Sequence, residues 1–178
     1  MKKLIVLAVF LTGCVPSANT VRLETPLLEG LTVETETEDE SEYTRKITCW
    51  SAPGSAKPKA CLRVTSLKSQ YGSSAMLFLE DSSNTPRESA LRAQLHGKLS
   101  FINVTDEGDS SNEVGKVQYL RLADATHQCV YLLQFSGGAG NWETYGPRAL
   151  GHTKIEAWYC DDILSEETVK TFCESVTF

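Results

Sequence analysis

The pattern of hydrophobic and polar positions predicts a chain built largely of β-strands. Short runs rich in β-branched and aromatic residues alternate with polar segments that contain Gly and Pro, which is typical of strands and turns. The candidate strands are 44–48, 61–65, 75–79, 99–104, 117–122, 128–135 and 153–160. Most are joined by short polar loops without the helices that parallel strands require, so we expect an antiparallel sheet of about five to seven strands.

Two segments have helical patterns instead. Between Thr85 and Gly97 the sequence supplies an N-cap, a proline at the first helical position, a capping-box glutamate and a glycine stop. Ser165 is the expected N-cap of a C-terminal helix. The apolar face of that helix comprises Val169, Phe172, Cys173 and Val176. Two helices on an antiparallel sheet predict a single α+β domain over residues 44–178.

The N-terminus departs from this pattern. Met1-Lys2-Lys3 precedes an apolar stretch, Leu4 to Leu11, that is too short to span a bilayer, and this order is typical of a secretory signal peptide. Leu11-Thr12-Gly13-Cys14 then resembles the lipobox of bacterial lipoproteins. The resemblance implies that residues 1–13 are removed and that the Cys14 thiol receives a diacylglycerol. The new amine is often acylated as well, so chains such as palmitate would form a stable membrane anchor.

The resemblance also implies a location in the cell envelope. In Gram-negative bacteria an Asp directly after the lipidated Cys tends to retain a lipoprotein at the inner membrane, and here that position is Val15. We therefore expect the outer membrane, with the domain in the periplasm. The alternative is an ordinary secreted protein in which Cys14 is incidental.

Charge is unevenly distributed along the chain. Residues 15–43 contain eight acidic residues and one basic residue, Arg22, whereas residues 44–178 contain 15 acidic and 14 basic residues. The acids concentrate in Glu34–Glu42, a self-repelling segment. We expect residues 14–43 to form the lipidated Cys14 and a flexible acidic tether of about 30 Å, within which Leu31-Thr32-Val33 alone has strand character. An acidic tail that binds a basic partner is the alternative. The nearly neutral domain excludes nucleic acid as an expected partner.

Five cysteines remain once Cys14 is assigned to lipid, and the expected compartment is oxidising. Cys49 and Cys61 flank a turn-rich segment and predict a bridged hairpin. In the best hydrophobic register of strands 128–135 and 153–160, Cys129 and Cys160 lie on opposite faces. We therefore expect Cys160 to pair with Cys173, and Cys129 to be a buried free thiol.

Segment 136–152 is the most unusual part of the sequence. It is longer than a hairpin between neighbouring strands needs, and long loops are often functional. Its aromatic and basic residues can stack on a sugar or hold a carboxylate. They are Trp142, Tyr145, Arg148 and His152. We expect them to bind an envelope protein or a cell-wall glycan, the alternative being a structural loop whose aromatic residues cover the sheet.

No catalytic, metal or cofactor motif stands out in the sequence. A thiol nucleophile at Cys129, with His127 or His152 as base, needs an exposed cysteine, whereas Cys129 lies in an apolar strand. Residues 106–113 look like an oxygen-rich loop but depart from the EF-hand order. The sequence predicts a non-enzymatic, membrane-anchored envelope lipoprotein without a cofactor. Its alternatives are an envelope hydrolase or thiol enzyme, and a structural anchor subunit of an envelope-spanning assembly.

Overall fold

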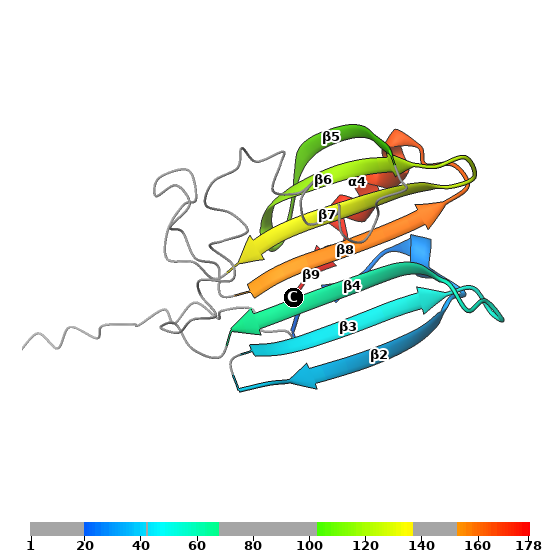
Figure 1. Ribbon diagram of the computed structural model, residues 1–178. Helices are drawn as coiled ribbons and strands as arrows, with labels where there is room; N and C mark the ends of the chain where they lie inside the picture. The colour runs from blue at the N-terminus through cyan, green and yellow to red at the C-terminus, as the bar shows by residue number, and fades with distance from the viewer. Residues whose placement is uncertain (1–19, 42, 68–102, 137–152) are drawn as a thin grey trace, which may run out of the picture.

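The computed structural model describes residues 20–41, 43–67, 103–136 and 153–178. Seven strands form one antiparallel sheet in the order β2-β3-β4-β8-β7-β6-β5 (Figure 1). They are β2 Thr32–Asp39, β3 Tyr43–Ser51, β4 Pro58–Leu67, β5 Asn103–Asn112, β6 Gly115–Ala123, β7 Gln128–Ser136 and β8 Thr153–Asp161. The remaining elements are β1 Arg22–Leu23, which pairs with β9 Val176–Thr177, the 3-10 turn η1 Pro26–Leu28 and the helix α4 Glu166–Glu174.

The structure confirms the antiparallel sheet. The strands expected at 44–48, 61–65, 117–122, 128–135 and 153–160 each lie within a slightly longer strand. The strand expected at 75–79 and the helix expected at 85–97 lie outside the described residues. Among the described residues α4 is the one α-helix. No helix in this part of the chain is long and apolar enough to cross a membrane.

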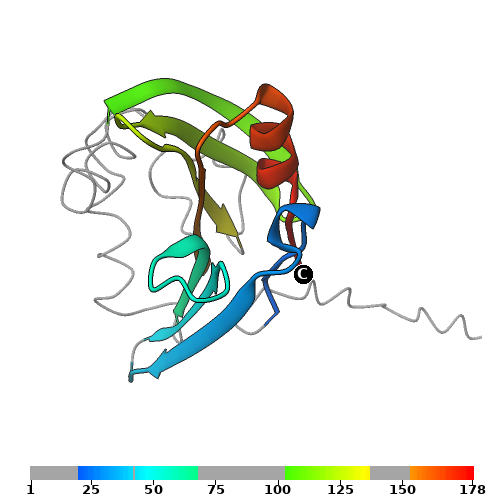
Figure 2. The same cartoon turned by 90° about the vertical axis from the view of Figure 1, so that its right-hand side faces the viewer.

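The curved sheet has two faces, each with its own apolar cluster. Helix α4 and η1 lie on the same side of the sheet, which we call the helix face (Figure 2). The larger cluster lies there and includes Val21, Val130, Leu132, Ile155 and Phe172. The opposite side, which we call the disulfide face, has a smaller cluster of Leu120, Leu122, Cys129, Tyr131 and Leu133. Strands β7 and β8 contribute apolar side chains to both faces, which makes them the centre of the fold.

The predicted flexible tether is wrong from residue 20 onwards. Val21 is 2% exposed within the helix-face cluster, and β2 pairs with β3 along its entire length. Self-repulsion does not prevent this pairing, because an edge strand keeps its carboxylates in water while its backbone is hydrogen-bonded. Glu38 is also neutralised by Arg45, whose Nη1 lies 2.9 Å from Oε2. The folded domain therefore begins near residue 20 rather than at residue 44.

The disulfide pairing is confirmed in one case and wrong in the other. Cys49 is bonded to Cys61, as expected, but Cys129 is bonded to Cys160, and Cys173 is a buried free thiol. Strands β7 and β8 place Cys129 directly opposite Cys160, so the expected register was shifted by one residue. Both strands carry apolar side chains on both faces, so hydrophobic alternation favoured the wrong one of two registers.

The oxygen-rich loop expected at 106–113 is also wrong, because most of it belongs to β5. This edge strand is largely exposed, so its polar side chains remain in water. Tyr119 lies across Gly108 from the neighbouring strand, and a Cβ atom on that glycine would be 2.5 Å from the tyrosine Oη. Asn112 closes the turn to β6 by accepting hydrogen bonds from the backbone N–H groups of Val114 and Gly115.

Helix α4 begins as the sequence predicts. The Ser165 hydroxyl accepts a hydrogen bond from the Thr168 backbone N–H at 3.1 Å, and Val169, Phe172 and Cys173 are buried. Arg121 of β6 holds the start of the helix by donating to Glu166 Oε1 and to the Leu164 carbonyl, both at 2.7 Å. Together these bonds fix the helix beside β5 and β6.

Candidate functional site

The loop that carries the predicted binding residues joins two neighbouring strands, as expected. Strand β7 ends at Ser136, β8 begins at Thr153, and these two residues are Cα partners. Trp142, Tyr145, Arg148 and His152 themselves lie outside the described residues. What the structure does provide is the end of the sheet from which this loop departs.

A cluster of charged and aromatic side chains lies close to that end, on the disulfide face. Its centre is Glu156 of β8, a carboxylate that is only 7% exposed. The Tyr131 hydroxyl of β7 donates a 2.7 Å hydrogen bond to Glu156 Oε1. Lys154 Nζ lies 3.8 Å from the same oxygen, and Arg63 Nη1 of β4 lies 3.6 Å from Oε2. We call these residues, with Trp158, the Glu156 cluster.

The electrostatics of the Glu156 cluster favour a bound anion or polar ligand. Two basic side chains, Arg63 and Lys154, lie beside one acid in a largely buried place. The Arg63 guanidinium lies 6.0 Å from the centre of the Trp158 ring, and its buried Nε atom has no hydrogen-bond partner among the described residues. A planar guanidinium with one such N–H group, next to an aromatic ring, suits a carboxylate or a sugar.

This cluster was not predicted from the sequence, although strand β8 carries a signal for it. Strand β8 is apolar at Ile155 and Ala157, but charged residues occupy the alternating positions Lys154 and Glu156. Charges in a central strand are costly to bury unless they are paired. Because Lys154 and Glu156 are two residues apart in a strand, their side chains lie on one face. Arg63 lies opposite Glu156 because β4 is the neighbour of β8 in the sheet.

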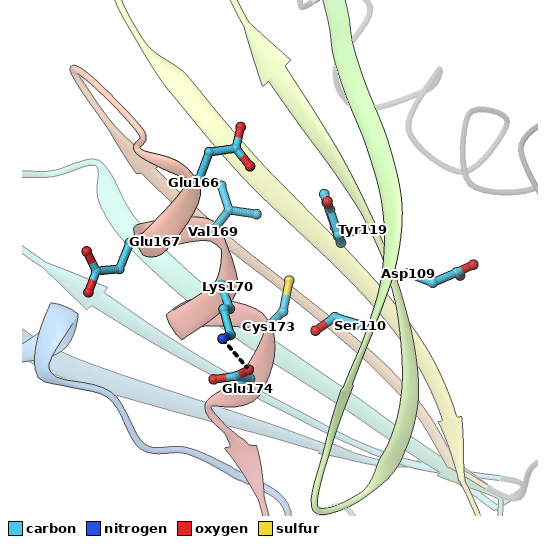
Figure 3. Close-up of a pocket in the computed structure, with 9 residues that line it drawn as sticks. All are labelled: Asp109, Ser110, Tyr119, Glu166, Glu167, Val169, Lys170, Cys173 and Glu174. Carbon is cyan, nitrogen blue, oxygen red and sulfur yellow. Dashed lines mark ion pairs between the residues drawn. The ribbon is translucent and has the colours of Figure 1, made fainter.

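The second candidate is a cavity of about 570 Å³ between α4 and the strands β5 and β6. Tyr119, Ser110 and Cys173 point into it, whereas Asp109 and Glu167 point away (Figure 3). Two further acids at its rim are already paired, Glu166 with Arg121 and Glu174 with Lys170. The cavity is therefore lined by weakly polar groups and has no concentrated charge to select a ligand.

The Cys173 thiol at this cavity is a poor nucleophile. Burial, and to a smaller extent Glu174, raises the pKa of Cys173 to about 12, so the thiolate is absent at neutral pH. Tyr119 is partly buried in the same cavity, and burial likewise raises its pKa. The cavity can accommodate a small molecule, but its groups are not activated for acid–base or nucleophilic chemistry.

The thiol-enzyme alternative loses its nucleophile in this structure, because Cys129 is bonded to Cys160. The proposed base His127 is exposed in the turn between β6 and β7, where its Nδ1 lies 2.7 Å from the Thr126 hydroxyl. Asp124 shapes that turn: hydrogen bonds from the Thr126 and His127 backbone N–H groups lower its pKa. These residues form a turn, and the second proposed base, His152, lies outside the described residues.

Within the described part of the chain, no group of three or more His, Cys, Asp or Glu side chains is arranged to hold a metal ion. Comparison with known proteins adds no assignment. No protein-family model, curated protein or solved structure matches this chain.

Proposed function

We propose that this protein is a lipid-anchored cell-envelope protein whose domain binds an envelope protein or a cell-wall glycan. In this proposal Cys14 is acylated and fixed in the outer membrane, and the domain lies in the periplasm. The observation that carries the proposal is the sequence Leu11-Thr12-Gly13-Cys14 behind a short apolar segment. The two disulfides support export, because such bonds persist in oxidising compartments.

The early start of the fold determines how the domain would be held. Val21 is buried, and at most about 25 Å of extended chain separates it from Cys14. A flexible tether of 30 residues is therefore replaced by a short connection. The domain would sit close to the membrane surface and meet partners within or next to that membrane.

The anchor is tested by substituting Cys14 and fractionating the cells. Cys14→Ala is expected to move the protein out of the membrane fraction or to leave the uncleaved precursor, whereas the control Val15→Ala keeps it in the membrane. Val15→Asp is expected to shift the protein from the outer to the inner membrane of a Gram-negative host. A cleaved Cys14→Ala protein that associates with the membrane as fully as the original chain would exclude a lipid anchor at this position.

The binding surface we propose combines the loop 136–152 with Arg63 and Lys154 of the Glu156 cluster. Both basic residues lie on the disulfide face, and Lys154 is the second residue after the loop. Trp142 and Tyr145 would stack on the ligand, and the basic side chains would hold a carboxylate or hydroxyl groups.

In vivo photo-crosslinking from positions 142 and 145 tests this surface. A defined adduct is expected from both positions and not from position 170, which lies on the exposed side of α4. Arg63→Gln should weaken the adduct, whereas Arg22→Gln, an exposed control, should leave it unchanged. Equal crosslinking from position 170, or none from 142 and 145, would contradict the proposed surface.

A further inference from the structure

The two edges of the large sheet differ in how they are protected. Strand β5 contains a register shift between Val104 and Asp106, and helix α4 packs beside it (Figure 2). Both features discourage another strand from pairing. Strand β2 pairs with β3 over eight residues without a register shift, and no strand among the described residues pairs with its outer edge. It also contains no Pro, and its charged residues are all acidic, so they protect this edge against an acidic strand but not against a basic one.

The direction of the backbone groups along β2 follows from the hairpin that it forms with β3. The Glu40 N–H donates to the Tyr43 carbonyl at 2.9 Å, which identifies residues 40 and 43 as a hydrogen-bonded pair. Such pairs alternate in an antiparallel ladder, so Glu34, Glu36 and Glu38 direct their backbone groups towards β3. Val33, Thr35 and Thr37 therefore direct theirs towards the open edge.

The side chains of β2 alternate as regularly as its backbone. Glu34, Glu36 and Glu38 lie on the disulfide face, on the same side as Cys49. Glu38 is paired with Arg45, whereas Glu34 and Glu36 have no ion-pair partner in the described structure. On the helix face, Val33 is 58% exposed. The disulfide Cys49–Cys61 joins the two strands behind this edge and holds it in place.

We propose that the outer edge of β2 binds an extended, basic peptide segment as an additional antiparallel strand. The open N–H and C=O groups of Val33, Thr35 and Thr37 would supply the backbone pairing. Lys or Arg side chains at alternating positions of the partner would lie opposite Glu34 and Glu36, and β-branched side chains would cover Val33. The partner is thus a protein segment that alternates basic and apolar residues.

Charge argues against a second copy of β2 as the occupant. Only the odd-numbered residues offer backbone groups to the edge, so two antiparallel copies of β2 have to pair odd with odd residues. This register places the glutamates of one copy opposite those of the other, which is destabilising. A basic segment removes this repulsion in the same register.

The proposal is tested by titrating the full chain with synthetic eight-residue peptides and measuring fluorescence anisotropy. A peptide that alternates lysine and valine is expected to bind about tenfold more tightly than one of the same composition with its lysines and valines in two blocks. A peptide with glutamate in place of lysine should not bind. Equal binding of the alternating and the block peptide would show that charge alone determines the affinity. This result would overturn the proposal that the peptide adds a strand to the sheet.

Substitutions in β2 separate backbone pairing from charge. Thr35→Pro removes one outward N–H and leaves the backbone ladder to β3 in place, but like Thr35→Ala it loses the hydroxyl hydrogen bond to Thr48. It should weaken binding about tenfold relative to Thr35→Ala, at the melting temperature of that control. Thr35→Ala keeps the N–H and is the matched control, expected within about twofold of the original. E34K combined with E36K should reverse the preference in favour of the glutamate peptide. Thr35→Pro with unchanged affinity would overturn the proposal.

Amide hydrogen exchange gives a readout that does not depend on any variant. In the free chain the N–H groups of Val33, Thr35 and Thr37 should exchange quickly, and the alternating peptide should protect these three groups. No protection at saturating peptide would contradict the assigned edge. The binding does not require the lipid, so the same titration on Cys14→Ala tests the edge independently of the proposed anchor.

Discussion

The side chain of Cys173 shows how burial sets the chemistry of a single residue. It lies on α4 against the helix face, is fully buried, and has no disulfide partner. Desolvation disfavours the thiolate, so the pKa rises to about 12. Oxidation of a thiol requires access from solvent, and the burial of Cys173 withholds this one.

The raised pKa of Cys173 predicts how stability depends on pH. The folded state keeps the thiol protonated above pH 9.0, where the unfolded chain begins to lose the proton. Unfolding is therefore increasingly favoured as the pH rises from about 9 towards 12. Urea denaturation at several pH values should show a steeper loss of stability in the original chain than in Cys173→Ala. Parallel curves for the two proteins would contradict the buried neutral thiol.

Glu156 is the second residue whose surroundings determine its contribution. Its carboxylate accepts a hydrogen bond from Tyr131 and lies between two basic side chains in a place where water has little access. Removing the charge takes away the ion-pair partner of Arg63 and Lys154 at a buried position, which is more costly than losing one hydrogen bond.

Glu156→Gln is therefore expected to lower the free energy of unfolding by about 3 kcal/mol. Tyr131→Phe, which removes the hydrogen bond to the carboxylate and keeps the ring and the charge of Glu156, should cost about 1–2 kcal/mol. Chemical denaturation at pH 7 measures both values. A Glu156→Gln protein as stable as the original would show that Arg63 and Lys154 do not depend on this acid.

At the scale of secondary structure, two cross-links tie neighbouring strands together. Cys49–Cys61 joins β3 to β4 across 12 residues of sequence, and Cys129–Cys160 joins β7 to β8 across 31 residues. Each bond restricts the unfolded chain, and the longer loop loses more entropy. The second bond also lies on the central strand pair, so it stabilises the part of the sheet that contributes to both apolar faces.

Replacing both cysteines of a pair by alanine should destabilise the protein by about 3 kcal/mol for Cys49–Cys61 and by about 4 kcal/mol for Cys129–Cys160. Thermal or urea unfolding of the two double variants checks the order. Peptide mapping without reduction should find these two bonds and an unmodified Cys173. A Cys160–Cys173 peptide would contradict the strand register described above.

Which elements were predictable depended on how many faces each one buries. Strands such as 117–122 and the helix after Ser165 have one clear pattern, and the structure confirms them, except that Val176, expected on the helix, belongs to β9. For β7 and β8 no face is polar throughout, so hydrophobic alternation favoured the wrong one of two registers, and this register led to the wrong disulfide. The polar edge strands β2 and β5 bury little, so the sequence pattern indicated only their first residues, in the strand character of Leu31-Thr32-Val33 and the strand expected at 99–104.

One part of the candidate site could be predicted from the sequence, and the other could not. The loop 136–152 was recognisable from its length and its aromatic residues, and the structure confirms that the strands at its two ends are neighbours. The Glu156 cluster was not foreseen, since it depends on β4 lying next to β8, a pairing between strands far apart in sequence. The loop can therefore be predicted from local sequence, whereas the cluster can be predicted only once the order of the strands is known.

At the scale of the whole molecule, the early start of the fold changes the expected relation to the membrane. Val21 and Leu23 are buried, and β1 pairs with β9 near the other end of the chain. An anchor at Cys14 would therefore hold the domain within a short distance of the lipid surface. The acidic residues that were expected to form a flexible tether instead lie in β2, at an edge of the sheet.

The account rests on Cys14 being acylated. The most direct measurement is mass spectrometry of the N-terminal peptide of the protein isolated from cells that express the full chain. The account predicts that this peptide begins at Cys14 and carries the added mass of a diacylglycerol on its thiol, with or without a further acyl chain on its amine. A peptide that begins elsewhere, or an unmodified thiol at Cys14, would contradict it.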